Sequence, residues 1–146
     1  MSTEPDRRQR RPEQVSPVVA LLTLSSVWDA ELGAALSDLR LTTRKYALLA
    51  HIHGAPGISF SELARRSQIT VQSAHTAVKA LVADKLVQDA TAHAGAASNL
   101  RSTPAGEAAL REAGERVAAL DARLHQSAPA LAAALITADD EPHLAR

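Results

Sequence analysis

The sequence contains no cysteine and few aromatic residues. The missing thiols exclude disulfides, thiol catalysis and cysteine-ligated metal centres. Aromatic residues make up 2% of the 146 residues and comprise Trp28, Tyr46 and Phe60. No apolar run approaches the roughly 18 residues of a transmembrane helix, and the charged N-terminus lacks the features of a signal peptide. A cytoplasmic protein without a membrane-spanning segment is therefore expected.

Alanine and leucine, by contrast, are abundant, with 31 and 19 copies. Both residue types favour closely packed helices over a β-sandwich, and the length fits one domain. The chain has 16 basic and 16 acidic residues, which are unevenly distributed. Residues 40–103 carry a net charge of +5, whereas 15–39 and 104–146 each carry −3. A basic centre between acidic flanks indicates a polyanionic partner, although ordinary solvated faces give the same pattern.

The N-terminal half is expected to be helical after a disordered arm over residues 1–14. Apolar residues at helical spacing predict a long amphipathic helix over 15–39. A second helix is predicted to be capped by Thr42 or Thr43 and to stop at Gly54.

Two capping signals follow closely and predict a helix–turn–helix. Ser59 and Glu62 match a capping box, in which the Ser hydroxyl and the Glu carboxylate each accept a backbone N–H of the other residue. Thr70 is predicted to cap the next helix, which runs to about Asp84. Its buried stripe is expected to comprise Ala74, Val78 and Leu81.

The C-terminal half combines a hairpin with helices. Residues 86–92 and 99–103 are β-prone segments around a small tip, and Pro104 begins a long helix. Apolar residues spaced alternately by three and four along this helix predict a coiled-coil seam for dimerisation. The seam comprises Leu110, Ala113, Val117, Leu120 and Leu124. Pro129 is expected to begin a short final helix.

This order predicts a mainly α fold with a small β-hairpin wing: a winged helix–turn–helix flanked by N- and C-terminal dimerisation helices. Residues 15–146 are expected to form one domain, in which 15–39 and 104–136 dimerise and 40–103 bind DNA. The second helix of the turn would enter the major groove with its polar side chains on base edges. Free N–H groups at the two capped helix starts would hold phosphates. The predicted DNA-binding residues are Ser59, Ser61, Thr70, Gln72, Ser73, His75, Thr76, Lys79 and Arg101.

Over residues 15–136 the chain resembles the MarR family of transcriptional regulators. The resemblance is carried by several segments in the family's order and spacing. They are Leu41-Thr-Thr-Arg-Lys-Tyr46, Pro56-Gly-Ile-Ser59, Glu62-Leu-Ala64, the Thr70–Leu81 helix, Leu86-Val87 and Leu100-Arg-Ser-Thr103-Pro-Ala-Gly106. The resemblance implies a homodimer that binds a pseudo-palindromic double-stranded operator and releases it when a small aromatic molecule binds.

The resemblance also implies an effector pocket between the first, second and fifth helices. The candidate effector-binding residues are Trp28, Asp29, Arg44, Tyr46 and His53. Each has a structural alternative: Trp28 as a dimer-core aromatic, Tyr46 as a core residue, and Asp29 and Arg44 as exposed or ion-paired groups.

The wing departs from the family pattern. The family's wing usually carries Asp-Arg-Arg-Ala before the second strand, where this chain has Ala94–Ala97. The Arg that usually pairs with the wing Asp is here Asp89, and the glycine usual before Leu86 is Lys85. Minor-groove reading by wing arginines is therefore not expected.

These observations favour a ligand-responsive, operator-binding repressor. The alternative is a degenerate MarR-like protein with a non-reading wing, which binds a small molecule or protein partner and lacks specific DNA binding. The six histidines are scattered along the sequence, so no metal site and no cofactor are expected. No catalytic motif stands out, so no enzymatic activity is expected.

Overall fold

The computed structural model describes residues 16–91 and 98–140, which form six α-helices, one 3-10 helix and an antiparallel two-stranded sheet. In chain order these elements are α1 (Pro17–Leu36), η1 (Ser37–Leu39), α2 (Thr43–Gly54), α3 (Phe60–Arg66), α4 (Val71–Ala83), β1 (Val87–Asp89), β2 (Leu100–Ser102), α5 (Pro104–Ser127) and α6 (Pro129–Asp140). The predicted mainly helical fold with a β-hairpin wing is confirmed. The predicted arm over 1–14 and the wing tip Ala94–Ala97 lie outside the described residues.

Local capping chemistry determines where the helices begin. The hydroxyls of four residues accept a hydrogen bond from the backbone N–H three positions later, as N-cap residues do. These residues are Thr42 (from Lys45, 3.2 Å), Ser59 (from Glu62, 3.1 Å), Thr70 (from Ser73, 3.1 Å) and Thr103 (from Gly106, 3.0 Å). Only half of the predicted capping box forms. The Glu62 carboxylate is bound by Arg65 and Arg66, at 2.7 Å each, instead of the Ser59 N–H.

The predicted N-terminal helix is shorter than expected. α1 ends at Leu36, and the 3-10 helix η1 replaces its last turn. The Ser37 hydroxyl donates to the Ala34 carbonyl at 3.0 Å, and Arg40 closes the turn in the left-handed region at φ 58°. This turn redirects the chain from α1 into α2, so residues 15–39 do not form one continuous helix.

Most of the buried core lies within residues 40–103, which we call the winged lobe, and Leu36 of α1 with Ala109 and Ala113 of α5 completes it. Side chains from α2, α3, α4 and β2 meet there with no exposed surface: Leu48, Leu49, Ile52, Leu63, Leu81 and Leu100. The strands pair with Gln88 opposite Arg101, and Gly57, at φ 83°, donates its N–H to the Leu100 carbonyl at 2.8 Å. The helix–turn–helix and the wing therefore share one interior.

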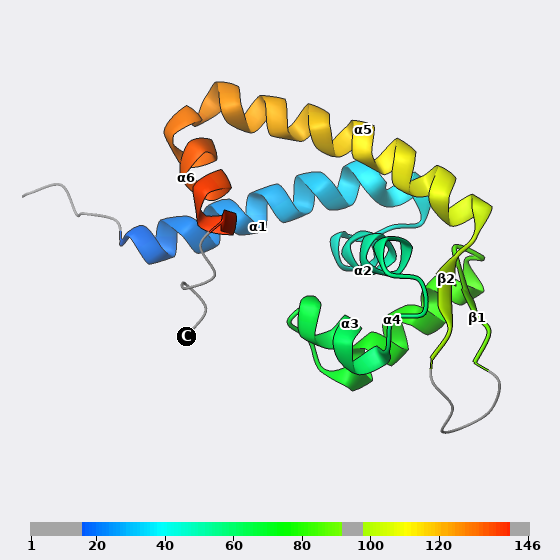
Figure 1. Ribbon diagram of the computed structural model, residues 1–146. Helices are drawn as coiled ribbons and strands as arrows, with labels where there is room; N and C mark the ends of the chain where they lie inside the picture. The colour runs from blue at the N-terminus through cyan, green and yellow to red at the C-terminus, as the bar shows by residue number, and fades with distance from the viewer. Residues whose placement is uncertain (1–15, 92–97, 141–146) are drawn as a thin grey trace, which may run out of the picture.

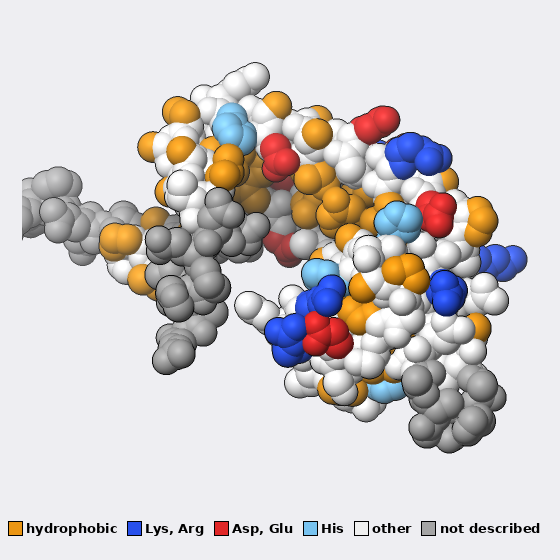
Figure 2. Space-filling view, in the orientation of Figure 1, with side chains coloured by type: hydrophobic (Ala, Val, Ile, Leu, Met, Phe, Trp, Pro, Cys, Tyr) orange, Lys and Arg blue, Asp and Glu red, His pale blue; other side chains and the backbone are white. Residues whose placement is uncertain are grey.

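The terminal helices α1, α5 and α6 form a layer beside this lobe, and α1 and α5 contact α2. α5 contacts both α1 and α6, and α6 turns from the far end of α5 at a steep angle towards α1 (Figure 1). Apolar side chains gather where these helices meet (Figure 2). Several remain more than half exposed, including Val18 and Leu22 on α1 and Ile136 on α6. Of the predicted α5 seam, Ala113 is fully buried within the protomer and the other four residues are half-buried, so most of the uncovered apolar surface lies on α1.

One finding on α1 differs from the sequence expectation. The helical segment Pro17–Leu39 is long and apolar enough to cross a membrane by length and composition alone. A count of uninterrupted apolar residues missed this because Thr23, Ser25 and Ser26 interrupt the run. Helices covered by other protein surfaces pass the same test. Glu31 within the segment binds Arg123 of α5 at 2.9 Å, and such a charge favours a protein environment over hydrocarbon.

Candidate nucleic-acid interface

The turn between α3 and α4 is held by backbone hydrogen bonds. Gln68 adopts a left-handed conformation at φ 52°, which reverses the chain after α3. Next to it, Ile69 donates its N–H to the Ala64 carbonyl at 3.0 Å and packs against the core. Thr70 then caps α4. These backbone contacts in the turn therefore fix the angle between α3 and α4.

Burial of one side of α4 determines which side faces outward. The predicted stripe of Ala74, Val78 and Leu81 is buried, as expected. The opposite side presents exposed polar side chains, which are Gln72, His75, Thr76 and Lys79. An exposed polar helix face beside a cation is the arrangement that base reading in a major groove requires.

An aromatic stack fixes His75 on this face. The His75 ring lies on the Phe60 ring with centroids 3.7 Å apart and an interplanar angle of 18°. Because Phe60 is the first residue of α3, the stack joins the two helices at their outer surface. Sequence reasoning assigned Phe60 no role, because a contact between residues 60 and 75 leaves no periodic signal.

The hydroxyl groups of α4 are partly occupied within the helix. Thr70 donates to the Ser73 hydroxyl at 2.9 Å, and Thr76 donates to the Gln72 carbonyl at 3.1 Å. Within the described part of the chain, the Gln72 amide, the His75 ring nitrogens and the Lys79 ammonium have no hydrogen-bond partner. These three groups are therefore the ones most available to a ligand.

An ion pair connects the far end of α4 to α2. Lys45 on α2 donates to Asp84 at 2.6 Å and to the Arg40 carbonyl at 2.5 Å. Asp84 is the C-cap residue of α4, and the Lys45 ammonium holds the pKa of that carboxyl below its usual value. The Lys45 side chain is mostly buried, so its ammonium is not available to bind a ligand.

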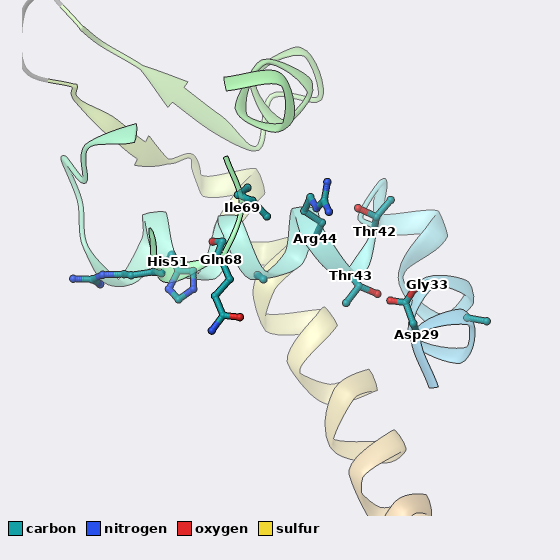
Figure 3. A pocket seen from close by; sticks show the side chains of 12 residues that line it. Asp29, Gly33, Thr42, Thr43, Arg44, His51, Gln68 and Ile69 are labelled. Atoms are coloured by element: carbon teal, nitrogen blue, oxygen red, sulfur yellow. The ribbon is translucent and has the colours of Figure 1, made fainter. Parts of the chain in front are cut away.

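A cavity of about 1000 Å³ lies between α1, the start of α2 and the turn before α4. Figure 3 shows Asp29 and Gly33 on α1, Thr43, Arg44 and His51 on α2, and Gln68 and Ile69 on the turn. The cavity therefore touches both the terminal helices and the helix–turn–helix. Cationic, acidic and apolar side chains all line it, which suits a small amphipathic ligand.

Comparisons with known proteins identify the family. A sequence profile of the MarR family matches residues 40–95. The HTH-type transcriptional repressor Rv2887 of Mycobacterium tuberculosis is 32% identical over 105 residues, which cover 71% of this chain and 76% of that protein. The chain belongs to the MarR family. The predicted resemblance is confirmed, and relatives of this MarR-family protein are transcriptional repressors.

Solved structures of the same relative match this MarR-family chain over most of its length. The crystal structure of Rv2887 in complex with DNA is 29% identical and has a TM-score of 0.64, covering 79% of this chain and 88% of that one. The complex of Rv2887 with salicylic acid is 27% identical and has a TM-score of 0.65, covering 88% and 97%. Both structures share the winged helix fold with this chain.

Two of the wing's departures from the MarR pattern lie within the described residues. Lys85 adopts φ 61°, a left-handed conformation that glycine adopts without strain. The Asp89 carboxylate accepts a hydrogen bond from the Thr91 N–H at 3.1 Å and another from the Thr91 hydroxyl. Asp89 therefore binds a residue that follows the end of β1. On β2, Arg101 is exposed and donates to the Asn99 side chain at 3.0 Å.

The remaining predicted DNA-contacting residues lie at the starts of the two helices. Ser59 and Ser61 are exposed at the start of α3, and Ser73 is half-buried in the first turn of α4. The structure therefore brings eight of the nine predicted residues to the helix–turn–helix, while Arg101 lies on the wing. Contact of these residues with DNA stays a prediction.

The predicted effector-binding residues are not gathered in one place. Asp29 and Arg44 line the cavity, whereas Trp28, Tyr46 and His53 are not among its lining residues. Trp28 is half-buried on α1 beneath the Arg123 guanidinium, which lies 5.7 Å from its ring centre. Tyr46 packs against the lobe core, and His53 Nδ1 lies 2.9 Å from the Ser102 hydroxyl. His51, Gln68 and Ile69 line the cavity but carried no sequence signal.

Within residues 16–91 and 98–140, no three His, Asp or Glu residues are close enough together to hold a metal ion.

Proposed function

We propose that this MarR-family protein is a homodimeric repressor that binds a pseudo-palindromic operator and releases it when a small aromatic acid binds. The observation that carries the proposal is the outward polar face of α4, with Gln72, a stacked His75 and Lys79. Gln can pair bidentately with adenine, His can bond to base edges, and Lys can neutralise a phosphate. The relative Rv2887 was crystallised in complex with DNA, which supports DNA binding by the same fold in this chain.

The uncovered apolar surface of α1 supports the homodimer. Leu22 is 65% exposed and Val18 is 64% exposed, and of the residues of α1 only Leu36 is buried within the protomer. Exposed apolar patches of this kind mark protein interfaces. A second copy would cover them by two-fold symmetry, and reading two half-sites one helical turn of DNA apart would require the two α4 helices to lie about 34 Å from each other.

The cavity between α1 and α2 supports the ligand response. It is lined by Arg44 and His51, which suit a carboxylate, and by Ala30, Ala47 and Ile69, which suit a ring. The relative Rv2887 was crystallised with salicylic acid. We place this repressor in the cytoplasm, because its proposed ligand is chromosomal DNA. We assign it no catalytic role.

The test begins with selection of binding sequences from random duplex DNA. The affinity of the selected palindrome and of a scrambled control is then measured by fluorescence anisotropy at two salt concentrations. We expect clear preference for the palindrome and a steep salt dependence from phosphate neutralisation. Equal affinity for both duplexes would favour the degenerate alternative, in which the protein binds a small molecule or protein partner without reading DNA.

A further inference from the structure

Arg44 borders two hollows that meet at the start of α2. One is the cavity of about 1000 Å³ that also includes Asp29 and His51. The other is a cleft of about 330 Å³ between α2 and the outward face of α4, which includes Gln72, Ser73 and Thr76. Arg44 and Thr42 are the two residues that line both hollows, and Arg44 alone of the two is charged.

The charge of Arg44 is available to a ligand, unlike that of its neighbour. Lys45 also lines the cleft, but its ammonium is bound by Asp84 and by the Arg40 carbonyl. Arg44 is exposed and forms no ion pair within the described part of the chain. Figure 3 shows its side chain leaving α2 on a different side from Thr43. Its staggered torsions allow an exposed arginine to reach either side at small cost.

We propose that a DNA phosphate and the effector carboxylate compete for the Arg44 guanidinium. Arg44 would then act as a switch between operator binding and effector binding. In the DNA-bound state its guanidinium binds a backbone phosphate in the cleft beside Gln72 and Ser73. An aromatic carboxylate in the large cavity draws the same guanidinium away. Both phosphate and carboxylate match the planar donor fork of arginine. This inference rests on the proposed function and specifies how the ligand would act.

The salt dependence of DNA binding distinguishes competition for the Arg44 guanidinium from a conformational change alone. Each phosphate contact contributes about 0.9 to the slope of log affinity against log salt concentration. Loss of the Arg44 contact should therefore lower the slope by roughly one unit per protomer. A neutral analogue with the same ring should not have this effect, because it offers the guanidinium no negative charge.

The experiment measures the salt slope of operator binding with and without sodium salicylate, and with salicylamide as the neutral control. Wild-type protein should lose affinity and about one unit of slope per protomer with salicylate, and should not respond to salicylamide. Arg44→Gln should show the reduced slope without ligand and no further change with salicylate. Arg111→Gln on α5 removes the same charge outside both hollows and should behave like wild type. Circular dichroism verifies that each variant is folded.

Two results would overturn the proposal while leaving DNA binding intact. One is an Arg44→Gln protein whose operator affinity still falls with salicylate. The other is a wild-type protein whose salt slope salicylate leaves unchanged, whether or not affinity falls. A wild-type protein with no preferred DNA sequence would instead contradict the proposed function itself.

Discussion

The winged lobe and the terminal helices differ in how completely each covers its own apolar surface. In the lobe, Leu48, Leu49 and Leu81 have no exposed surface. On the terminal helices, Leu22 and Ile136 are each at least 60% exposed. The core of the lobe is therefore covered within one protomer, with Leu36, Ala109 and Ala113 of the terminal helices completing it, whereas apolar side chains of α1 and α6 stay uncovered. Covering of these side chains by a second copy should make the free energy of unfolding depend on protein concentration.

The largest expected effect tests the dependence of the terminal helices on a second copy. Leu22→Asp would place one charge from each protomer in the proposed interface, at a cost on the order of 4 kcal/mol of dimerisation free energy. Leu22 tests this better than the predicted seam residue Leu120, which is already half-buried within the protomer. Sedimentation equilibrium should show dimeric wild type and monomeric Leu22→Asp.

Ala108→Asp, at an exposed position of α5, is the charge-matched control and should remain dimeric. A wild-type protein that sediments as a monomer at micromolar concentration would remove the distinction between the two regions.

The second prediction concerns the joint between the two regions. A Cβ on Gly106, in the first turn of α5, would lie 2.1 Å from the Leu86 carbonyl oxygen. The clashing atom belongs to the backbone, which cannot move aside as a flexible side chain can. Gly106→Ala should therefore lower the free energy of unfolding by about 3 kcal/mol. Gly114, further along the same helix, has nothing within 4 Å of such a Cβ. Gly114→Ala should therefore leave stability unchanged or raise it by up to about 1 kcal/mol, and urea unfolding measures both. Equal effects of the two substitutions would show that the joint is loose.

Local features of the sequence predicted much of the fold. The hydroxyls of Thr42, Ser59 and Thr70 cap the helices that were expected to begin there, because a cap involves atoms only three residues apart. The end of α1 at Leu36 was not predictable in the same way. No glycine or proline stands directly after it, and the left-handed conformation of Arg40 is sterically disfavoured for residues other than glycine.

The candidate sites were predictable only in part. The outward polar face of α4 followed from the spacing of Ala74, Val78 and Leu81. The stack of His75 on Phe60 and the sharing of Arg44 by two hollows join residues that are distant in sequence. Such contacts depend on how the helices pack, which no single segment determines.

The third prediction concerns the cap of α4 within the lobe. Thr70→Ala removes the oxygen that accepts the Ser73 N–H and should cost about 1 kcal/mol of unfolding free energy. Thr23→Ala on α1 is a matched control, because that hydroxyl only donates to the Val19 carbonyl within its helix. It should be neutral or slightly stabilising. Thermal unfolding compares the two, and a destabilised Thr23→Ala with unchanged Thr70→Ala would reverse the expected roles.

The smallest expected effect is a pH dependence within the lobe. The guanidinium groups of Arg65 and Arg66 lower the pKa of Glu62 from 4.5 to about 2. Because the folded pKa is the lower one, the stabilisation is complete above pH 4.5 and is lost as pH falls towards about 2. Glu62→Gln should flatten the stability profile over this range, by a small amount because the pair is solvated and screened by salt. Urea midpoints across the range test this, and an unchanged slope in the variant would contradict it.

The central claim is that the outward face of α4 reads base sequence. Its most direct test compares Gln72→Ala with Lys79→Gln on the selected operator and on a scrambled duplex. We predict that Gln72→Ala costs about 1–3 kcal/mol on the operator and little on the scrambled duplex. Lys79→Gln should weaken both duplexes alike and lower the salt slope. Equal losses on both duplexes with Gln72→Ala would contradict the account.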